Sequence, residues 1–282
     1  DRINKVDSFE IFDPACGDGE LLRAVSDAAP PSLREKLRLW GIDKDAAALE
    51  RAEANLKHAG IGSVVLLCED FMSTVAPNQS NAQLDFALES DPRCGLRLFE
   101  QFDAVISNPP YGVEWKKDKE AVEHEAERGF TGRFGAGLPR ISDGQFLFIQ
   151  HAIYKFRPKT DGGSNAAIIT NGSPLFTGDA GSGESEIRRW ILENDLLEAI
   201  IAMPEQLFFN TGIATYVWIF SNRKDKERKG AVQLVDARKI KTQLRRNLGA
   251  KRYEISEENA KEITELYSEF KKDERCKIFP TT

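Results

Sequence analysis

Residues 107–112 read S-N-P-P-Y-G and follow the short apolar run F-D-A-V-I at 102–106. The apolar run is typical of an interior strand of a parallel sheet. Two consecutive prolines cannot donate to a ladder, and Pro109 keeps Asn108 out of the helical region, so a stiff, extended loop is expected after the strand. A rigid loop at the carboxyl end of an α/β strand suits ligand binding. The alternative is a Pro-rich turn with a surface Tyr111.

A second candidate lies between the run F-E-I-F at 9–12 and the helical pattern that begins at Leu21. This turn reads D-P-A-C-G-D-G over 13–19, and its small residues let a ligand approach the backbone and the helix N-terminus. When the dinucleotide-binding motif G-x-G-x-x-G is counted from Gly17, its third glycine is replaced by Leu22, so the motif that binds a pyrophosphate is incomplete. The candidate binding residues here are Asp13, Pro14, Ala15, Cys16, Gly17 and Gly19.

Two further strand ends carry acids. Asp43 ends the second strand, about two dozen residues after the Gly loop, where a carboxylate can accept both hydroxyls of a ribose. Asp70 and Phe71 end the third strand and offer an acceptor for an exocyclic amine and an aromatic face. Taken singly, each has a plainer explanation: a tight turn, a helix cap or a core residue. Four strand ends in this order favour a bound nucleoside cofactor, with the substrate at 107–112.

The elements that must position these residues alternate along the chain. Strands are predicted at 9–12, 39–42, 64–67, 102–107, 166–170, 197–202 and 213–220, with helices near 21–29, 45–58, 146–156 and 184–193. This alternation predicts an α/β fold, a doubly wound and mostly parallel sheet of about seven strands. The last strand follows a short turn, so it is expected to be antiparallel. A tail strand at 231–235 and a final helix at 257–270 follow. We expect an irregular insertion at 73–100 and a mobile loop at 113–142.

The composition is that of an ordinary globular domain, with 282 residues, 41% hydrophobic and 30% charged. No apolar run is long enough to span a bilayer and no signal segment opens the chain, so no membrane partner and a cytoplasmic location are expected. Four scattered cysteines without C-x-x-C spacing and three histidines predict no metal site. The chain starts at Asp1 without a Met, which suggests a piece of a longer protein.

The net charge of −6 argues against nucleic-acid binding through the overall field. Between 223 and 252, however, the sign reverses locally, because Lys and Arg far outnumber acids. The stretch can be a solvated hairpin and loop, or a contact surface for phosphate or an acidic partner.

The four motifs together resemble those of the S-adenosylmethionine-dependent DNA N6-adenine methyltransferases. D-P-A-C-G-D-G is similar to their first motif, G-I-D-K-D to their second, C-E-D-F to their third and N-P-P-Y to their catalytic motif. N-A-A-I-I-T-N-G-S-P-L-F, L-F-F-N-T-G-I-A-T-Y-V-W-I-F and K-R-Y-E-I-S further resemble the modification subunit of type I restriction systems. The resemblance implies a Rossmann-like class I methyltransferase sheet, S-adenosylmethionine as cofactor and double-stranded DNA as substrate.

The resemblance also implies roles for individual residues. The target adenine is flipped out of the duplex, and the Asn108 side-chain oxygen and the Pro109 carbonyl accept its two N6 hydrogens. Pro110 stiffens the loop, Tyr111 stacks on the base, and Phe208 faces the base from the other side. The cofactor is held by the Gly loop, Asp43, Asp70, Phe71 and Asn108.

We predict a methyltransferase domain over 1–222 and a C-terminal extension over 223–282, without the helical N-terminal domain of the family. The expected partners are a specificity subunit and a restriction subunit. The alternatives are an N-P-P-Y methyltransferase acting on RNA or protein glutamine, a non-catalytic scaffold and, more distantly, a nicotinamide-dependent oxidoreductase.

Overall fold

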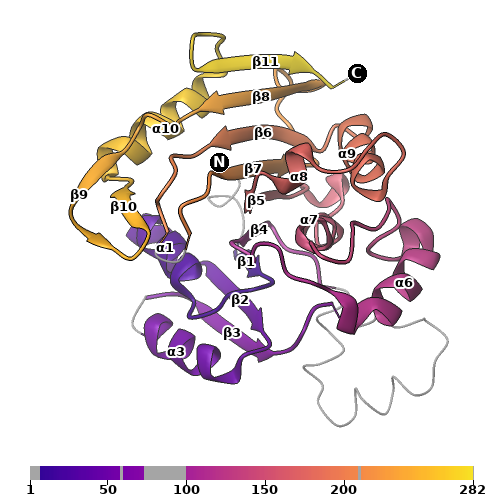
Figure 1. Cartoon of the computed structure of the whole chain (residues 1–282). Helices are drawn as coiled ribbons and strands as arrows, with labels where there is room; N and C mark the ends of the chain where they lie inside the picture. The colour runs from indigo at the N-terminus through magenta and orange to yellow at the C-terminus, as the bar shows by residue number, and fades with distance from the viewer. Residues whose placement is uncertain (1–6, 58–59, 73–99, 209–210, 282) are drawn as a thin grey trace. The chain divides into compact units, whose positions relative to one another are not determined.

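The computed structural model describes residues 7–57, 60–72, 100–208 and 211–281. The chain divides into two compact units, residues 1–165 and 166–282 (Figure 1), and each is considered by itself. Of the insertion predicted at 73–100, residues 73–99 lie outside the described part. The predicted boundary at 222/223 stays a prediction of domain organisation.

The first unit is built on four parallel strands in the order β4-β1-β2-β3. They are β1 (Phe9–Asp13), β2 (Leu37–Asp43), β3 (Ser63–Cys68) and β4 (Ala104–Ser107). Because all four run the same way, the Gly loop, Asp43, the segment 69–72 and Asn108 follow their strands at one edge of the sheet. All four strands occur where the sequence predicted them.

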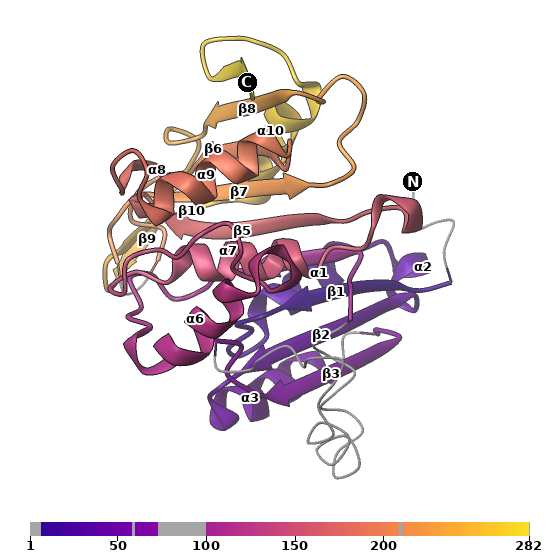
Figure 2. The ribbon, with the colours of Figure 1, turned by 90° about the vertical axis from the view of Figure 1, so that its right-hand side faces the viewer.

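Helices cover both faces of this sheet. Ile11 belongs to a buried cluster with Leu22 of α1 (Glu20–Ala28) and Leu49 of α3 (Ala46–Leu56). The next residue, Phe12, points to the other face, where its ring lies 6.0 Å from that of His151 on α7 (Gln145–Tyr154). Accordingly, α7 lies to the right of the strands in Figure 1 and on the viewer's side of them in Figure 2.

Local capping explains where the helix of the second βα unit begins. Asp45 precedes α3 and its side chain accepts from the Ala47 amide at 2.9 Å, which satisfies an otherwise unpaired helix N–H. The helix was predicted from Asp45 to about residue 58, and it ends at Leu56. A short α2 (Pro31–Arg34) between α1 and β2 was not predicted.

The prediction of a mobile loop at 113–142 was wrong. The segment contains α6 (Lys119–Glu127), and two of its aromatic side chains are almost completely buried, Trp115 at 2% and Phe134 at 0% exposure. Trp115 also donates its indole N–H to the Arg140 carbonyl at 2.9 Å. The many charged residues and glycines of segment 113–142 suggested a solvated loop, but these buried aromatic side chains pack the segment into the first unit.

In the described residues of the second unit, the main sheet has five strands in the order β11-β8-β6-β7-β5. They are β5 (Asn165–Asn171), β6 (Leu197–Ala202), β7 (Thr215–Ser221), β8 (Ala231–Asp236) and β11 (Cys276–Pro280). Strand β7 is antiparallel to β6, as predicted, and β8 is parallel to β6. The antiparallel β11 beside β8 was not predicted.

Helices again lie on both faces of the second unit's sheet, with α10 (Glu257–Glu269) to the left of β6 and β8 in Figure 1 and α9 (Gly183–Glu193) to the right. Ile201 packs with Ile263 of α10, whereas its neighbour Ile200 lines a pocket with Ile191 of α9. A short α8 (Ser173–Phe176) follows β5, and β9 (Thr242–Leu248) and β10 (Lys251–Glu254) form a separate antiparallel hairpin. In the described part of the chain, no helix is long and apolar enough to cross a membrane.

Candidate active site

The Gly loop after β1 is closed by hydrogen bonds to a buried acid. Asp13 is 1% exposed and accepts through Oδ1 from the Ala15 amide at 3.0 Å and from the Ser107 hydroxyl at 2.9 Å. Burial raises the pKa of the Asp13 carboxyl to about 7, although both hydrogen bonds favour the charged form. Asp13 therefore ties the Gly loop to the residue that precedes Asn108, and near neutral pH a large fraction of it is uncharged.

Two glycines give this loop its shape. Gly17 and Gly19 have φ angles of 50° and 74°, which favour glycine. A Cβ on Gly19 would lie 3.1 Å from the Cβ of Ala52 on α3, whereas a Cβ on Gly17 would meet nothing within 4 Å. Gly19 thus allows close packing of the loop on α3, and Gly17 leaves the backbone open to a ligand.

Cys16 is a core residue as far as its side chain is concerned. It is 6% exposed, belongs to the buried cluster around Ile11, and packs so tightly on Gly41 that a Cβ there would lie 2.8 Å from its Sγ. Burial, and then the nearby Asp13 and Asp43, raise the pKa of the thiol to about 12. Cys16 is therefore a protonated, inert thiol, and we expect its backbone, not its sulfur, to face a ligand.

Asp43 links the end of β2 to the Gly loop. Its Oδ2 accepts from the Gly17 amide at 2.9 Å, and its Oδ1 accepts from the Asp45 amide at 3.0 Å. Each carboxylate oxygen offers about two lone-pair sites, so one acceptor position on each remains. The carboxylate is thus fixed by backbone on both sides while it can still accept two more hydrogen bonds.

A pocket of about 90 Å³ joins these strand ends. Six of the predicted residues line it: Pro14, Ala15, Asp43, Asp70, Phe71 and Pro110. Asp70 is held by the Met72 amide, which donates to its Oδ1 at 3.0 Å, and its Oδ2 lies 3.9 Å from the Lys44 ammonium. Pockets that enclose a drug-sized ligand have roughly 300–1,000 Å³. This pocket therefore suits one end of a ligand, such as a flat ring beside Phe71.

Phe71 is anchored by a buried charge network that the sequence did not predict. Its ring lies 4.3 Å from that of Phe148 on α7 and is 5% exposed, and its carbonyl accepts from Arg133 Nη1 at 2.5 Å. The Arg133 guanidinium contacts Glu125 Oε2 at 3.2 Å, and Glu125 Oε1 also contacts Arg128 at 2.9 Å. Burial lowers the pKa of Arg133, which Glu125 opposes. The network fixes the backbone next to Asp70.

The N-P-P-Y loop differs from this network because its polar groups face solvent. Asn108 is exposed, and the half-buried Tyr111 donates its hydroxyl to Asn108 Oδ1 at 2.8 Å. Pro109 is buried and Pro110 is exposed at the rim of the pocket. Burial raises the pKa of the Tyr111 phenol, so it remains a hydrogen donor at neutral pH. The Asn108 amide is therefore oriented by Tyr111 and is also accessible.

A sequence model of the family described as N-6 DNA Methylase matches residues 1–279. The chain belongs to this family. The MjaIX methylase subunit of a type I restriction enzyme from Methanocaldococcus jannaschii is 26% identical over 267 residues, which are 94% of this chain and 42% of that protein. The chain spans between 40% and 43% of the length of three such relatives from that organism.

Solved structures show the same fold. The methyltransferase subunit of a type I restriction-modification system from Streptococcus thermophilus superposes with a TM-score of 0.75 at 21% identity, over 98% of this chain and 51% of that one. A Listeria monocytogenes protein described as a class I S-adenosylmethionine-dependent methyltransferase superposes with a TM-score of 0.57 at 21% identity, over 83% of this chain and 60% of that one. The predicted class I methyltransferase fold is confirmed.

Phe208, which the resemblance assigns to the base, belongs to the second unit of the chain. It is half-buried in the loop that follows β6. Its role toward the base stays a prediction, as do the roles of the residues around the pocket in the first unit.

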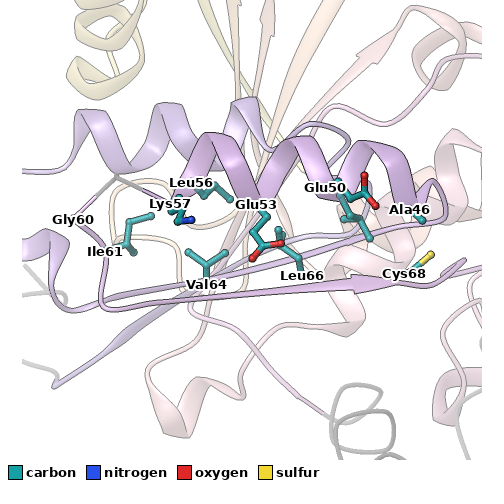
Figure 3. A pocket seen from close by; sticks show the side chains of 11 residues that line it. Ala46, Glu50, Glu53, Leu56, Lys57, Gly60, Ile61, Val64, Leu66 and Cys68 are labelled. Carbon is teal, nitrogen blue, oxygen red and sulfur yellow. The ribbon is translucent and has the colours of Figure 1, made fainter.

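A wider groove of about 720 Å³ lies along α3 and the edge strand β3 (Figure 3). Figure 3 shows Glu53 of α3 beside Val64 and Leu66 of β3. None of the predicted site residues lines this groove. In this family member, size alone would therefore point to the groove, whereas the predicted residues at the strand ends line the smaller pocket.

The sequence assigned no role of their own to Arg133, Glu125 and Ser107, nor to five other residues that line the pocket: Lys44, Glu69, Met72, Val113 and Phe148. For Ser107, the only signal in the sequence is its position directly before the N-P-P-Y motif. Arg133 lies in the glycine-rich stretch G-F-T-G-R-F-G-A-G-L-P and is 62 residues from the carbonyl that it contacts. A single charge in a polar stretch does not reveal such a partner.

Proposed function

We propose that this chain is the catalytic core of a DNA N6-adenine methyltransferase that uses S-adenosylmethionine and serves as the modification subunit of a type I restriction-modification system. The observation that carries the proposal is the pocket in the first unit, where the Gly loop, Asp43, Asp70 and Pro110 of the N-P-P-Y loop come together. Membership of the N-6 DNA methylase family supports the same reaction.

The residues around the pocket fit the nucleoside part of the cofactor. Asp43 keeps one acceptor position on each oxygen, which matches the two hydroxyls of a ribose. Asp70 can accept from an exocyclic amine while Phe71 offers an aromatic face, and the broken glycine fingerprint fits a ligand without a pyrophosphate. When bound, S-adenosylmethionine supplies a methyl group activated by a positively charged sulfur.

The N-P-P-Y loop fits a planar amine. Asn108 Oδ1 and the Pro109 carbonyl would accept the two N6 hydrogens of adenine, which would leave the nitrogen lone pair less tied to the ring and therefore more nucleophilic. The Tyr111 hydroxyl, already bonded to Asn108, would hold that amide in place. Its ring would stack on the flipped base, an interaction worth about 1–3 kcal/mol. Positioning and hydrogen bonding thus supply the catalysis.

The substrate is double-stranded DNA, from which the adenine is flipped at a cost of a few kcal/mol of unstacking. A separate specificity subunit would read the sequence, and a restriction subunit would accompany it. The named relatives are methylase subunits of type I restriction enzymes, which supports this arrangement.

The full-length protein, assembled with its specificity subunit, tests the proposal. It is incubated with methyl-labelled S-adenosylmethionine and, in parallel, DNA, RNA and cell protein, and the labelled product is digested to nucleosides or amino acids. Label in N6-methyladenine of DNA is the expected result. Label in RNA or in glutamine would support another N-P-P-Y methyltransferase, and no label with any substrate would support a scaffold.

A further inference from the structure

The basic stretch from 223 to 252 consists of two parts with different structural roles. In the first part, Lys224 is buried and its ammonium contacts Asp195 at 2.5 Å, and the buried Arg228 lies 3.7 Å from Glu198. These charges are neutralised inside the second unit. These two charges are structural, whereas Lys226 and Lys229 in the same part are exposed and alternate with Asp225 and Glu227 in the sequence.

The second part is different because its exposed positive charges are not interrupted by acids. Residues 239–252 contain six Lys and Arg and no Asp or Glu, in a chain whose net charge is −6. Most of them lie on the β9–β10 hairpin, where Arg245, Arg246 and Arg252 are exposed. None of these three arginines forms an ion pair with an acid in the described part of the chain. The charge is therefore available to a partner.

The hairpin also has a suitable shape for a nucleic acid. Successive residues of a strand point to opposite faces, so Arg245 and Arg246 lie on the two sides of the ribbon. A two-stranded β-ribbon is narrow enough to enter the major groove of B-DNA, which is about 12 Å wide. In such a position, one arginine could approach each phosphate backbone. Leu248 is a single exposed apolar side chain nearby, which is ordinary for a protein surface.

The hairpin follows β8 at the carboxyl edge of the second unit's sheet, where β6 also ends. Strand β8 is parallel to β6, with Ala202 opposite Asp236, so the chain leaves both strands at the same edge. The amides of Arg252 and Tyr253 donate to the Gln206 carbonyl at 2.9 and 3.3 Å. This carbonyl is two residues before Phe208, which is predicted to face the base.

We propose that the β9–β10 hairpin is a contact surface for the DNA phosphate backbone, next to the 203–208 loop that carries Phe208. The inference rests on the proposed function, because it takes DNA as the substrate. Arginines that neutralise phosphates release counterions, so each such arginine steepens the salt dependence of binding. An acidic protein surface is the competing partner, and it would leave no such trace in DNA binding.

The test uses the full-length protein with its specificity subunit and a fluorescent mixed-sequence duplex of about 30 base pairs. Its dissociation constant is measured by anisotropy between about 50 and 200 mM KCl. For Arg245→Gln/Arg246→Gln, we expect weaker binding and a log–log salt slope that is shallower by about 1.8, or roughly 0.9 for each phosphate that is no longer neutralised. Both side chains are exposed, so thermal unfolding should be unchanged.

Two controls have matched chemistry. Arg245→Lys/Arg246→Lys keeps both charges and should keep most of the slope. Lys226→Gln/Lys229→Gln removes two exposed charges from the β7–β8 turn, at the opposite end of β8, and should leave the slope unchanged. An equal loss of slope in this control would overturn the inference, because the effect would then come from net charge alone.

An unchanged slope in the arginine variant would also overturn the inference. If that variant instead loses the specificity subunit, the hairpin binds protein. Labelling of adenine by the wild-type complex is measured in the same samples. If the wild-type complex labels adenine but the arginine variant keeps the wild-type salt slope, the methyltransferase assignment stands and only the proposed role of the hairpin is wrong. If the wild-type complex labels no adenine, the proposed function itself is wrong.

Discussion

The buried network behind Phe71 and the exposed N-P-P-Y loop support the same pocket in opposite ways. Arg133 and Glu125 are almost completely buried, and their contacts end on a backbone carbonyl of the pocket wall. Asn108 is exposed, and its amide contacts a neighbour only three residues away. This difference fits the proposed function and a division of work in which the network would hold the wall of the pocket and the loop would contact the substrate. Substitutions in the buried network should therefore lower the free energy of unfolding, and substitutions in the N-P-P-Y loop should lower kcat.

The largest effect on stability is expected from Arg133→Met. This substitution leaves the Glu125 carboxylate without its fully buried charged partner, and breaking a buried pair in this way costs about 3–5 kcal/mol. Urea denaturation of the full-length protein measures the change. Arg128→Met is the control, since Arg128 contacts the same carboxylate from a partly exposed position, and it should cost much less. Equal losses would show that Arg133 has no special role.

The largest effect on activity is expected from Asn108→Ala. By analogy with the removal of one donor from an oxyanion site, the loss of one acceptor for the amine should lower kcat by about 10²–10³-fold. The exposed position predicts a stability change within about 0.5 kcal/mol. Methylation kinetics and urea denaturation are compared on the same preparation. If Asn108→Ala keeps the wild-type kcat, or if it loses stability as well as kcat, Asn108 does not act mainly on the substrate and the proposed division is wrong.

Asp13 should give the stability a dependence on pH. Its pKa rises from 3.8 to about 7 on folding, so the folded state holds a proton that the unfolded chain releases in this range. The contribution is fully present below about pH 4 and is lost as the pH rises toward 7. In Asp13→Asn, which is always neutral, the stability curve should be flatter between these values. A curve of unchanged slope would contradict the buried, protonated Asp13.

The smallest effect is expected from Tyr111→Phe. The substitution removes the hydroxyl that holds the Asn108 amide but keeps the ring for stacking, and a neutral hydrogen bond is worth about 0.5–1.5 kcal/mol. We expect kcat to fall by only several-fold. Tyr111→Ala removes the ring as well and should also weaken binding of the flipped base. If the two variants behave alike, stacking contributes nothing measurable.

The same two regions show how far the sequence can be interpreted. Three local features could be predicted from the sequence: the Gly loop, the cap at Asp45 and the N-P-P-Y turn. They depend on contacts between residues close in sequence, or on conformations that glycine and proline favour, so the residue types predict the structure. The strands follow from apolar runs for the same reason. Their order in the sheet could be inferred only from the resemblance.

The Phe71 network could not be predicted, because no local pattern signals it. Glu125 lies on a helix with a largely polar sequence, and Arg133 follows in a glycine-rich stretch that suggested a mobile loop. Burial of a few anchors, such as Trp115 and Phe134, overrides the polar average of that segment. The hydrogen bond from Ser107 to Asp13 could not be predicted either, because it joins two strands whose residues lie 94 positions apart in the sequence.

The most direct test of this division is a calorimetric titration of the full-length protein with S-adenosylmethionine, carried out on the wild type, Asp43→Ala and Asn108→Ala. We expect binding by the wild type, near-complete loss of binding in Asp43→Ala and largely retained binding in Asn108→Ala, whose defect lies in methyl transfer. Wild-type affinity in Asp43→Ala would contradict this expectation, because the cofactor would then not depend on the strand end to which the pocket assigns it.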